Sequence, residues 1–528
     1  MRGLMMDMPL LIGNIVRHAE RVYPQREVVS LLHDGRKHRQ SYAETFARAR
    51  RLSSALQQLG IEAGDRVATL AWNDHRHLEC YYGISCLGAV CHTVNPRLFP
   101  EQIAYILDHA ADRWLVTDTE FLPVLAGIAK ELESLEGLIL LAGAGEPSAD
   151  FIRSLDYEEL LAGGDPDFAW PEFDERTAAA LCYTSGTTGH PKGVLYSHRS
   201  VILHSYAGIS ADGFGLSARD IILPVVPMFH VNAWGIPYAA PMAGAGLVLP
   251  GRHAGNPRAL TELLNNEAVS ITAGVPTVWQ ALVDYLDEEG LELPGLERLV
   301  VGGSAPSLAL IQRLMARGIE VRPAWGMTET SPLGTVNTPA RRDAARSDEE
   351  LVRAGRPIFG IELRIVDDSG QELPWDGQAF GALQVRGPWV CARYYGSEDS
   401  APADWFDTGD VATIDPSGSM QITDRTKDVI KSGGEWISSI ELENIAMAHP
   451  AVQEAAVIGR PHPKWDERPL LVVVLRDGVE VSEQELLDFY QGKVAKWWIP
   501  DAVAFVDEIP HTATGKISKL KLKERLRD

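Results

Sequence analysis

The sequence predicts an α/β protein: a large, multi-subdomain amino-terminal domain of mostly parallel sheets and helices, followed by a small, mobile α+β lid domain. Three observations predict it. A chain of 528 residues exceeds what one hydrophobic core usually supports. Short apolar runs alternate with helix-like stretches along most of the chain. The composition then changes near the carboxyl end, where lysine becomes frequent.

The predicted strands are short apolar segments bounded by turn residues, at 67–72, 114–117, 221–227 and 299–303. Between such segments lie longer stretches of helical character, for example 42–59 and 257–267. Strands that alternate with helices indicate largely parallel, buried sheets.

A domain boundary is predicted where the lysine content rises, after Asp424. The chain ends in a basic run formed by Lys519, Lys521, Lys523, Arg525 and Arg527. We place the two domains at 1–426 and 427–528, which gives the lid about a hundred residues, the usual size of a small domain.

Composition and charge exclude several classes of protein. Apolar residues make up 45% of the chain and charged residues 23%, as in an ordinary globular enzyme. The formal net charge of -23 argues against nucleic acid as a partner, because phosphate backbones need a basic face. Small anionic ligands remain compatible with it, since lysines and backbone amides can bind phosphate locally.

The sequence favours a cytoplasmic protein without an integral membrane segment. The stretch 1–9 lacks the apolar run of a signal peptide, and no segment reaches the roughly 18 apolar residues of a membrane span. The cysteines form no Cys-x-x-Cys pair, so we expect buried thiols rather than a metal or disulfide site. These cysteines are Cys80, Cys86, Cys91, Cys182 and Cys391.

The strongest signal for chemistry is a loop at 183–193, between the apolar stretches 178–182 and 193–196. Its glycines permit close backbone approach, so successive N–H groups can point at one anion. It is not a Walker A loop, because Gly193 follows Lys192. A flexible surface turn would leave its density of donors unexplained. The predicted phosphate-binding residues are Thr184, Ser185, Gly186, Thr187, Thr188, Gly189 and Lys192.

This loop resembles the phosphate-binding signature of the adenylate-forming superfamily, which includes acyl-CoA synthetases, luciferases and peptide-synthetase adenylation domains. Four further segments resemble motifs of that superfamily, in the same order. They are the Trp-Gly-Met-Thr-Glu-Thr segment at 325–330, the Thr-Gly-Asp segment at 408–410, the hinge segment at 424–435 and the lysine loop at 510–516. Five ordered motifs spanning most of the chain make the resemblance specific.

The resemblance implies a catalytic role for Lys516, whose ammonium would stabilise the negative charge that develops on the α-phosphate. Elsewhere in the basic tail a lysine would be a solvated charge. Thr328 is expected to donate to the α-phosphate. Glu329, with Thr184, is expected to bind Mg²⁺, which prefers hard oxygen ligands. In another context the Thr328–Glu329 pair would be a helix cap and a surface charge.

For the nucleoside, the resemblance implies that Asp410 accepts from the ribose hydroxyls, with Arg425 as a second contact. An aspartate after glycine is otherwise a common turn residue. Gly302 and Gly303 would lie along the adenine and the acyl pocket. The remaining predicted ATP/AMP contacts are Ala324, Trp325, Gly326, Met327 and Lys427.

For the acid, the resemblance places His230 beside the substrate carboxylate, with a satisfied structural histidine as the alternative. Val231, Trp234 and Gly302 would line the acyl pocket, and Trp234 would act as a gate or floor unless it is simply a core residue.

For the lid, Lys427 occupies the hinge position. The predicted coenzyme A contacts are Lys431, Gly433, Gly434, Glu435 and Trp436.

These roles imply an ATP- and Mg²⁺-dependent acid–CoA ligase that forms acyl-AMP, transfers the acyl group to coenzyme A, and releases AMP and pyrophosphate. The whole chain resembles bacterial medium- and long-chain fatty-acid–CoA ligases. The tryptophan at 325 is shared with 3-methylmercaptopropionate–CoA ligases, so a short thioether or branched acid stays an alternative. Homodimer formation is left open.

Two other functions are weighed. An adenylating enzyme that loads a carrier protein is disfavoured by the intact 432–436 segment and by the absence of an attached carrier domain. A nucleotide-binding module without catalysis would be expected to lose Lys516, Glu329 or the phosphate loop.

Overall fold

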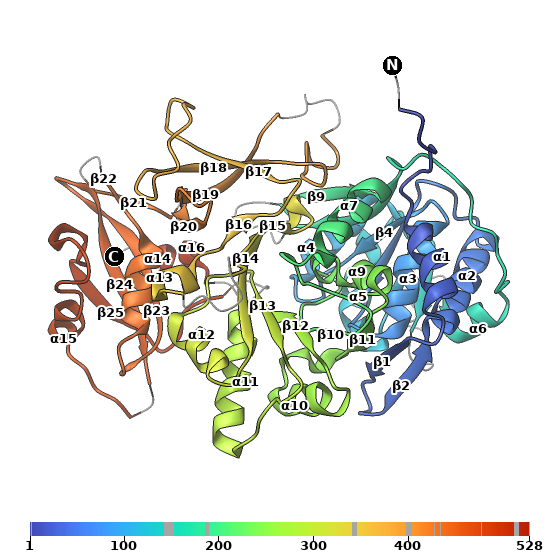
Figure 1. Cartoon of the computed structure of the whole chain (residues 1–528), viewed down its shortest axis with the longest axis horizontal. Helices are drawn as coiled ribbons and strands as arrows, with labels where there is room; N and C mark the ends of the chain where they lie inside the picture. Colours follow the sequence, from blue (N-terminus) through green and yellow to red (C-terminus); the bar gives the residue numbers. More distant parts are fainter. Residues whose placement is uncertain are drawn as a thin grey trace.

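The computed structural model describes residues 1, 3–141, 153–184, 190–339, 346–397, 404–426, 428–432, 435–476, 478–511 and 517–526 (Figure 1). Within these ranges the strands form sheets of seven, nine, four and five strands. The two larger sheets are mostly parallel and lie in the amino-terminal part, and a small carboxyl-terminal domain follows. The predicted α/β class with a large and a small domain is therefore confirmed.

The seven-stranded sheet has the order β7-β6-β5-β3-β4-β8-β9. All its neighbours run parallel except β8 and β9, which form an antiparallel hairpin around the predicted phosphate loop. The strands are β3 (Arg66–Leu70), β4 (Val90–Thr93), β5 (Asp112–Thr117), β6 (Gly137–Leu140), β7 (Ser154–Asp156), β8 (Ala178–Tyr183) and β9 (Gly193–Ser197).

The nine-stranded sheet has the order β16-β15-β14-β13-β12-β10-β11-β1-β2. Its strands from β14 to β1 run parallel, and antiparallel strands complete both edges. The strands are β1 (Glu27–Leu31), β2 (Lys37–Ser41), β10 (Ile221–Pro224), β11 (Gly246–Leu249), β12 (Ile271–Gly274), β13 (Arg298–Val301), β14 (Glu320–Gly326), β15 (Leu333–Val336) and β16 (Arg356–Pro357).

Helices pack on both faces of each large sheet. The helices that lie between the two sheets share one apolar core with both. The inner layer joins the two sheets through a single apolar cluster and contains α1 (Ile12–Val22), α2 (Tyr42–Gln58), α3 (His75–Cys86), α7 (His198–Ile209) and α9 (Ile236–Ala243). On the far face of the seven-stranded sheet lie α4 (Pro100–Ala110) and α5 (Leu122–Ile128). On the far face of the nine-stranded sheet lie α10 (Pro257–Asn266), α11 (Pro276–Glu289), α12 (Leu308–Met315) and the end of α13 (Asp348–Val352). The short helix α6 (Tyr157–Ala162) packs beside α2.

The second helix shows how local sequence specifies these elements. The Ser41 hydroxyl accepts from the Glu44 N–H at 3.2 Å, and the Glu44 carboxylate accepts from the Ser41 N–H at 2.7 Å, which is a complete capping box. Farther along, Gly83 of α3 faces α2 so closely that a Cβ there would lie 2.9 Å from the Ala49 oxygen. The absent side chain allows the two helices to pack closely.

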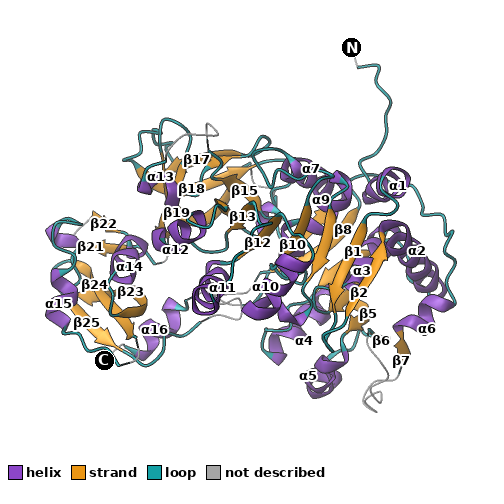
Figure 2. Ribbon diagram, turned by 60° about the horizontal axis from the view of Figure 1, so that its bottom comes forward, coloured by secondary structure: helices purple, strands orange, loops and turns teal. Residues whose placement is uncertain are grey.

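A four-stranded antiparallel sheet follows, with β17 (Glu362–Val366), β18 (Phe380–Arg386), β19 (Phe406–Ile414) and β20 (Met420–Arg425). The five-stranded sheet contains β21 (Ile430–Ser432), β22 (Glu435–Ile437), β23 (Val452–His462), β24 (Asp466–Leu475) and β25 (Ala502–Phe505). It carries α14 (Ser439–Met447), α15 (Glu483–Asp488) and α16 (Lys519–Arg525). Figure 2 shows this small domain clustered at the end of the molecule opposite α2. The exact boundary between 426 and 427 stays a prediction.

The small domain contacts the end of β20 through buried polar groups. The Ser439 N–H donates to the Asp424 carboxylate at 2.6 Å, and Lys519 pairs with Glu443 at 2.7 Å. Lys519 also donates to the Ser439 hydroxyl. Burial favours the neutral form of Lys519, but Glu443 and Asp424 outweigh it and raise its pKa. One cation therefore connects α16 to α14 and, through Asp424, to β20.

Four of the five cysteines are buried free thiols, as expected, but Cys391 is only partly buried. It lies in the loop after β18 and packs against the main core without being fully covered, which corrects the expectation for that residue. Across the described ranges, no helix is long and apolar enough to cross a membrane.

Candidate functional site

The predicted site residues follow the carboxyl ends of parallel strands. Thr184 follows β8, Gly302 follows β13, and Trp325 and Gly326 end β14. Because parallel strands present their carboxyl ends at one edge, loops from separate parts of the chain meet there, and ligands of open α/β sheets bind at such edges. The sequence alone provided the motifs. In the structure β13 and β14 are neighbours in the nine-stranded sheet, whereas β8 belongs to the seven-stranded sheet, so the loops come from the edges of two sheets.

The base of the phosphate loop is held by the hairpin of β8 and β9. The Thr184 N–H donates to the Lys192 oxygen at 2.9 Å, and the Lys192 N–H donates to the Thr184 hydroxyl at 3.1 Å. These reciprocal bonds fix the points where the loop leaves and re-enters the sheet. The predicted residues Ser185, Gly186, Thr187, Thr188 and Gly189 lie outside the described residues.

Thr328 and Glu329 lie in a short 3₁₀ turn, Thr328–Thr330, and are 6% and 5% exposed. The Tyr196 hydroxyl, on β9, donates to the Thr328 oxygen at 2.7 Å. This bond links the strand after the phosphate loop to the Thr-Glu motif, so the predicted phosphate and metal residues are close in the fold.

A residue that the sequence analysis missed, Tyr394, contacts two of the predicted ones. Its hydroxyl donates to Glu329 Oε1 at 2.7 Å, and Lys192 Nζ lies 4.8 Å from the centroid of its ring. The neighbouring Cys391 N–H donates to the Glu329 oxygen at 2.7 Å. The only sequence signal was a pair of tyrosines at 394–395 in a loop without apolar periodicity.

Glycine is sterically required in the predicted nucleotide loops. A Cβ at Gly326 would lie 1.6 Å from the Pro332 oxygen, so no other residue fits there. At Gly302 a Cβ would lie 3.0 Å from the Ala324 oxygen and 3.1 Å from the Trp234 ring. Gly303 has a φ of +85°, in the left-handed region.

Asp410 contacts two other predicted nucleotide residues. It is 3% exposed, accepts from Trp325 Nε1 at 2.9 Å, and pairs with Arg425 Nε at 2.8 Å. Its own N–H donates to the Thr408 hydroxyl at 3.1 Å. The carboxylate is therefore fixed between β14, β19 and β20, next to the start of the hinge segment.

The segment after β10, predicted to contact the acid, contains an unusual backbone. Val231, Asn232, Ala233 and Trp234 have φ values of 46°, 51°, 47° and 57°, so the turn labelled α8 (Val231–Trp234) is left-handed. Left-handed helical geometry costs non-glycine residues roughly 1–2 kcal/mol each, so the surrounding structure must hold this turn.

Buried polar side chains stabilise this left-handed turn. Asn232 is 5% exposed, and its side-chain oxygen accepts from the Cys182 thiol at 3.1 Å. The Tyr81 and Thr93 hydroxyls approach the same oxygen at 3.4 Å each. Just upstream, Asn73 accepts from the Met228 N–H at 2.7 Å. The turn is thus fixed to β4 and β8, the latter leading into the phosphate loop.

The structure brings two of the predicted acyl-pocket residues, Trp234 and Gly302, into contact. The Trp234 ring lies against Gly302, is partly buried, and packs on the main core. Val231 is 3% exposed. His230 is half-buried, and its N–H donates to the Pro227 oxygen at 3.1 Å. Trp234 therefore combines a core contact with a position over the predicted adenine and acyl loop.

Comparison with known proteins agrees with this geometry. Residues 16–395 match the model of the AMP-binding enzyme family, and residues 441–516 match that of the AMP-binding enzyme C-terminal domain. The chain belongs to the AMP-binding enzyme family.

This AMP-binding enzyme has relatives over its whole length. It is 52% identical to 3-methylmercaptopropionyl-CoA ligase of Ruegeria lacuscaerulensis, over 100% of this chain and 99% of the relative. It is 50% identical to the medium-chain-fatty-acid–CoA ligase of Ectopseudomonas oleovorans, over 100% and 98%. The crystal structure of the anthranilate CoA ligase AuaEII in complex with anthranoyl-AMP matches with a TM-score of 0.87 at 26% identity, over 99% of this chain and 98% of that one.

Several predicted lid residues of the AMP-binding enzyme lie outside the described residues: Lys427, Gly433, Gly434 and Lys516. Lys431 and Trp436 are paired across the hairpin of β21 and β22, as are Ser432 and Glu435. The predicted coenzyme A residues Lys431, Glu435 and Trp436 therefore lie on one hairpin.

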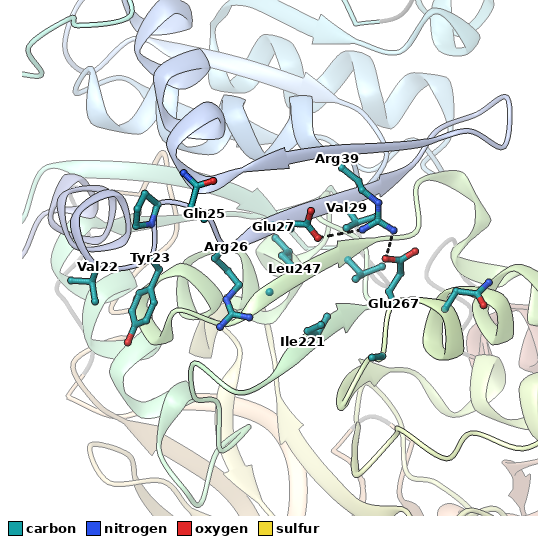
Figure 3. A pocket seen from close by; sticks show the side chains of 15 residues that line it. Val22, Tyr23, Gln25, Arg26, Glu27, Val29, Arg39, Ile221, Leu247 and Glu267 are labelled. Carbon is teal, nitrogen blue, oxygen red and sulfur yellow. Dashed lines mark hydrogen bonds and ion pairs between the residues drawn. The ribbon is translucent and has the colours of Figure 1, made fainter.

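A hollow of about 830 Å³ lies away from this site (Figure 3). It is lined by the first residues of β1, β10 and β11, at the amino ends of the strands and opposite the loops described above. Its Arg39 pairs with Glu267 at 2.6 Å. The site of the AMP-binding enzyme is thus defined by motifs and contacts rather than by this hollow.

The left-handed turn leads to a stability prediction. Ala233→Gly and Ala239→Gly each remove a buried methyl group, the first from the turn and the second from the right-handed helix α9. Glycine adopts left-handed geometry without strain, so Ala233→Gly should lower the free energy of unfolding by about 1–2 kcal/mol less than Ala239→Gly. Denaturant unfolding of both variants measures the difference. Equal losses would contradict the left-handed turn.

Proposed function

We propose that the chain is an ATP-dependent acid–CoA ligase. The observation that carries the proposal is the meeting of the phosphate-loop hairpin, the Thr328–Glu329 turn and Asp410 at the carboxyl edge of the sheets. Relatives at 50–52% identity over the whole chain are named as acid–CoA ligases, which supports the same reaction.

In the first proposed step, a carboxylate oxygen of the acid attacks the α-phosphorus of ATP and pyrophosphate leaves, which gives acyl-AMP. The hairpin ending in Thr184 and Lys192 binds the phosphates, and Thr328 donates to the α-phosphate. Charge builds on the phosphate oxygens during attack, so fixed donors lower the barrier more than they stabilise bound ATP. Lys516 supplies the positive charge from the lid.

Glu329 fits the predicted Mg²⁺ site. Its carboxylate is buried, and Tyr394 donates to one oxygen, which leaves the other available. The described residues contain no cluster of three or more metal-ligating side chains. A small number of protein ligands suits Mg²⁺, which takes one or two protein oxygens and completes its coordination shell with phosphate and water. Glu329 and Thr184 would hold the ion, which supplies neutralisation of phosphate charge.

Asp410 is proposed to accept hydrogen bonds from the ribose hydroxyls. In this structure its two oxygens are taken by Trp325 and Arg425, which orient the carboxylate. Arg425 is nearly half-exposed, with a side-chain exposure of 43%, and is the partner that ribose would share or displace. The Gly302–Gly303 loop and Ala324–Met327 complete the proposed nucleoside contacts.

In the second proposed step, the coenzyme A thiol attacks the acyl carbon and AMP leaves. The lid turns at Lys427 between the two steps, so that one cleft serves both reactions. The hairpin of β21 and β22 would then line the thiol channel through Lys431, Gly433, Gly434, Glu435 and Trp436. The cytoplasmic location and a homodimer stay predictions.

The proposed acid is a medium- to long-chain fatty acid, with a short thioether acid as the second candidate. The relatives named above include both kinds. An apolar pocket separates neighbouring chain lengths by only about 1–3 kcal/mol per methylene, so small changes near Trp234 suffice to alter the preference. Loading of a carrier protein is the third candidate.

A panel of acids tests the proposal. Coenzyme A-dependent AMP release is measured for straight-chain acids from acetate to stearate, with 3-methylmercaptopropionate and benzoate added. We expect release that requires both acid and coenzyme A, with a maximum at medium to long chains. AMP release that is acid-dependent but indifferent to coenzyme A would favour the carrier-loading function.

Lys516→Ala separates the two half-reactions. Because its charge is proposed to act only during adenylation, acyl-AMP formation should fall by several orders of magnitude, while supplied acyl-AMP still reacts with coenzyme A. Pyrophosphate exchange measures the first step and thioester formation the second. Lys523→Ala removes a charge from the same tail and should leave both steps near wild type. Equal loss of both steps in Lys516→Ala would show that the assignment is wrong.

Trp234→Ala tests the acyl pocket. If the ring closes the tunnel as a gate, its removal should mainly raise ATP hydrolysis without acid. If the ring is a floor, the preferred chain should lengthen by several carbons. The acid panel distinguishes the two. Unchanged selectivity with a stability loss of ~3–5 kcal/mol, typical of a deleted buried aromatic, would make Trp234 a core residue only.

A further inference from the structure

Tyr394 lies between the two charged groups proposed to bind ATP and its metal ion. Its hydroxyl donates to Glu329 Oε1 at 2.7 Å, and Lys192 Nζ lies 4.8 Å from the centroid of its ring. Within the described part of the chain, neither Lys192 nor Glu329 forms an ion pair. One side chain therefore contacts an anion at its polar tip and a cation on its face.

Both contacts suit tyrosine. An ammonium is attracted to the negative face of an aromatic ring, and a hydroxyl forms a strong, charge-assisted hydrogen bond to a carboxylate. Burial, and next the Glu329 charge, raise the pKa of the Tyr394 phenol above its ordinary value, so the hydroxyl remains a donor at any physiological pH.

The loop that carries Tyr394 is fixed on both sides to the same two motifs. The Cys391 N–H donates to the Glu329 oxygen at 2.7 Å, and the Tyr395 N–H donates to the Gly193 oxygen at 2.8 Å. The Phe406 ring packs edge-on against Tyr394, with centroids 6.1 Å apart. These contacts hold the tyrosine in place between the Thr-Glu turn and the hairpin of β8 and β9.

These two contacts place the tyrosine between the ammonium of exposed Lys192 and the buried carboxylate of Glu329. A direct Lys192–Glu329 ion pair in a weakly screened site would neutralise the charge that phosphate needs and the charge that a metal ion needs. We propose that Tyr394 is a positioning residue that keeps Lys192 and Glu329 apart and oriented, so that the ammonium stays available to ATP phosphate and the carboxylate to Mg²⁺. This inference rests on the proposed function, because it takes ATP and Mg²⁺ as the ligands.

The test is calorimetric binding of ATP by the full-length protein, without Mg²⁺ and across a Mg²⁺ titration. Tyr394→Phe keeps the ring and loses the hydroxyl. The Mg²⁺ concentration that gives half of the Mg²⁺-dependent change in ATP binding should therefore rise about tenfold. This is the loss expected for a hydrogen bond to a charged group. Binding of ATP without Mg²⁺ should stay at the wild-type level, because Lys192 keeps its place on the ring.

Tyr394→Leu removes both contacts and should also weaken Mg²⁺-free ATP binding, by roughly tenfold, since Lys192 then pairs with Glu329. Adding Glu329→Gln to that variant should restore Mg²⁺-free binding, which a merely structural role would not explain. Tyr395→Phe is the matched control, because within the described residues its hydroxyl makes no hydrogen bond.

Two results would overturn the inference and leave the proposed function intact. One is a Mg²⁺ titration of Tyr394→Phe that matches that of the wild-type protein. The other is a Tyr394→Leu, Glu329→Gln double variant that binds Mg²⁺-free ATP no better than Tyr394→Leu. Absence of ATP binding by the wild-type protein would overturn both.

Discussion

The burial of the Glu329 carboxylate is the constraint around which the proposed active site is organised. A buried charge without a partner is expensive, and the described residues offer Glu329 no ion pair. The Tyr394 hydroxyl donates to the carboxylate, while the Cys391 N–H and the Tyr196 hydroxyl fix the turn by donating to the backbone oxygens of Glu329 and Thr328. The remaining charge is left for a ligand. A site that is electrostatically incomplete in the free protein is what binding of a metal–nucleotide complex requires.

A strained element depends on neighbouring strands of the seven-stranded sheet. The left-handed turn at Val231–Trp234 is held by Asn232, which receives hydrogen bonds from β4, α3 and the last part of β8. Since β8 leads directly into the phosphate loop, the proposed acid segment and the proposed phosphate segment share one support. Backbone strain of this kind persists only where surrounding contacts over-determine it. The arrangement places Trp234 against Gly302, so that the proposed nucleoside loop and the proposed acyl pocket would have a common wall.

Much of the fold and the family were predictable from the sequence, because they rest on local signals. The strand at 67–72 and the helix at 42–59 are marked by apolar runs and by the Ser41–Glu44 capping box, and the structure has β3 and α2 there. The glycines at 302 and 326 were predicted from motifs, and the steric necessity of Gly326 and the tight space at Gly302 became visible only in three dimensions. Tyr394 and Asn232 were missed because their importance lies in contacts with residues 65 and 50 positions away, which leave no periodic or motif signal. The left-handed turn was missed because only Asn232 in Val-Asn-Ala-Trp is a residue type enriched at positive φ, and one such residue does not predict four in succession.

The central claim is that a carboxylate oxygen attacks the α-phosphorus of ATP at this edge of the sheets. The most direct measurement uses a fatty acid with both carboxylate oxygens labelled with ¹⁸O, turned over with ATP and coenzyme A. Mass spectrometry then locates the label. The account predicts one labelled oxygen in AMP, one retained in the thioester, and none in pyrophosphate. Unlabelled AMP, or label in inorganic phosphate, would contradict it.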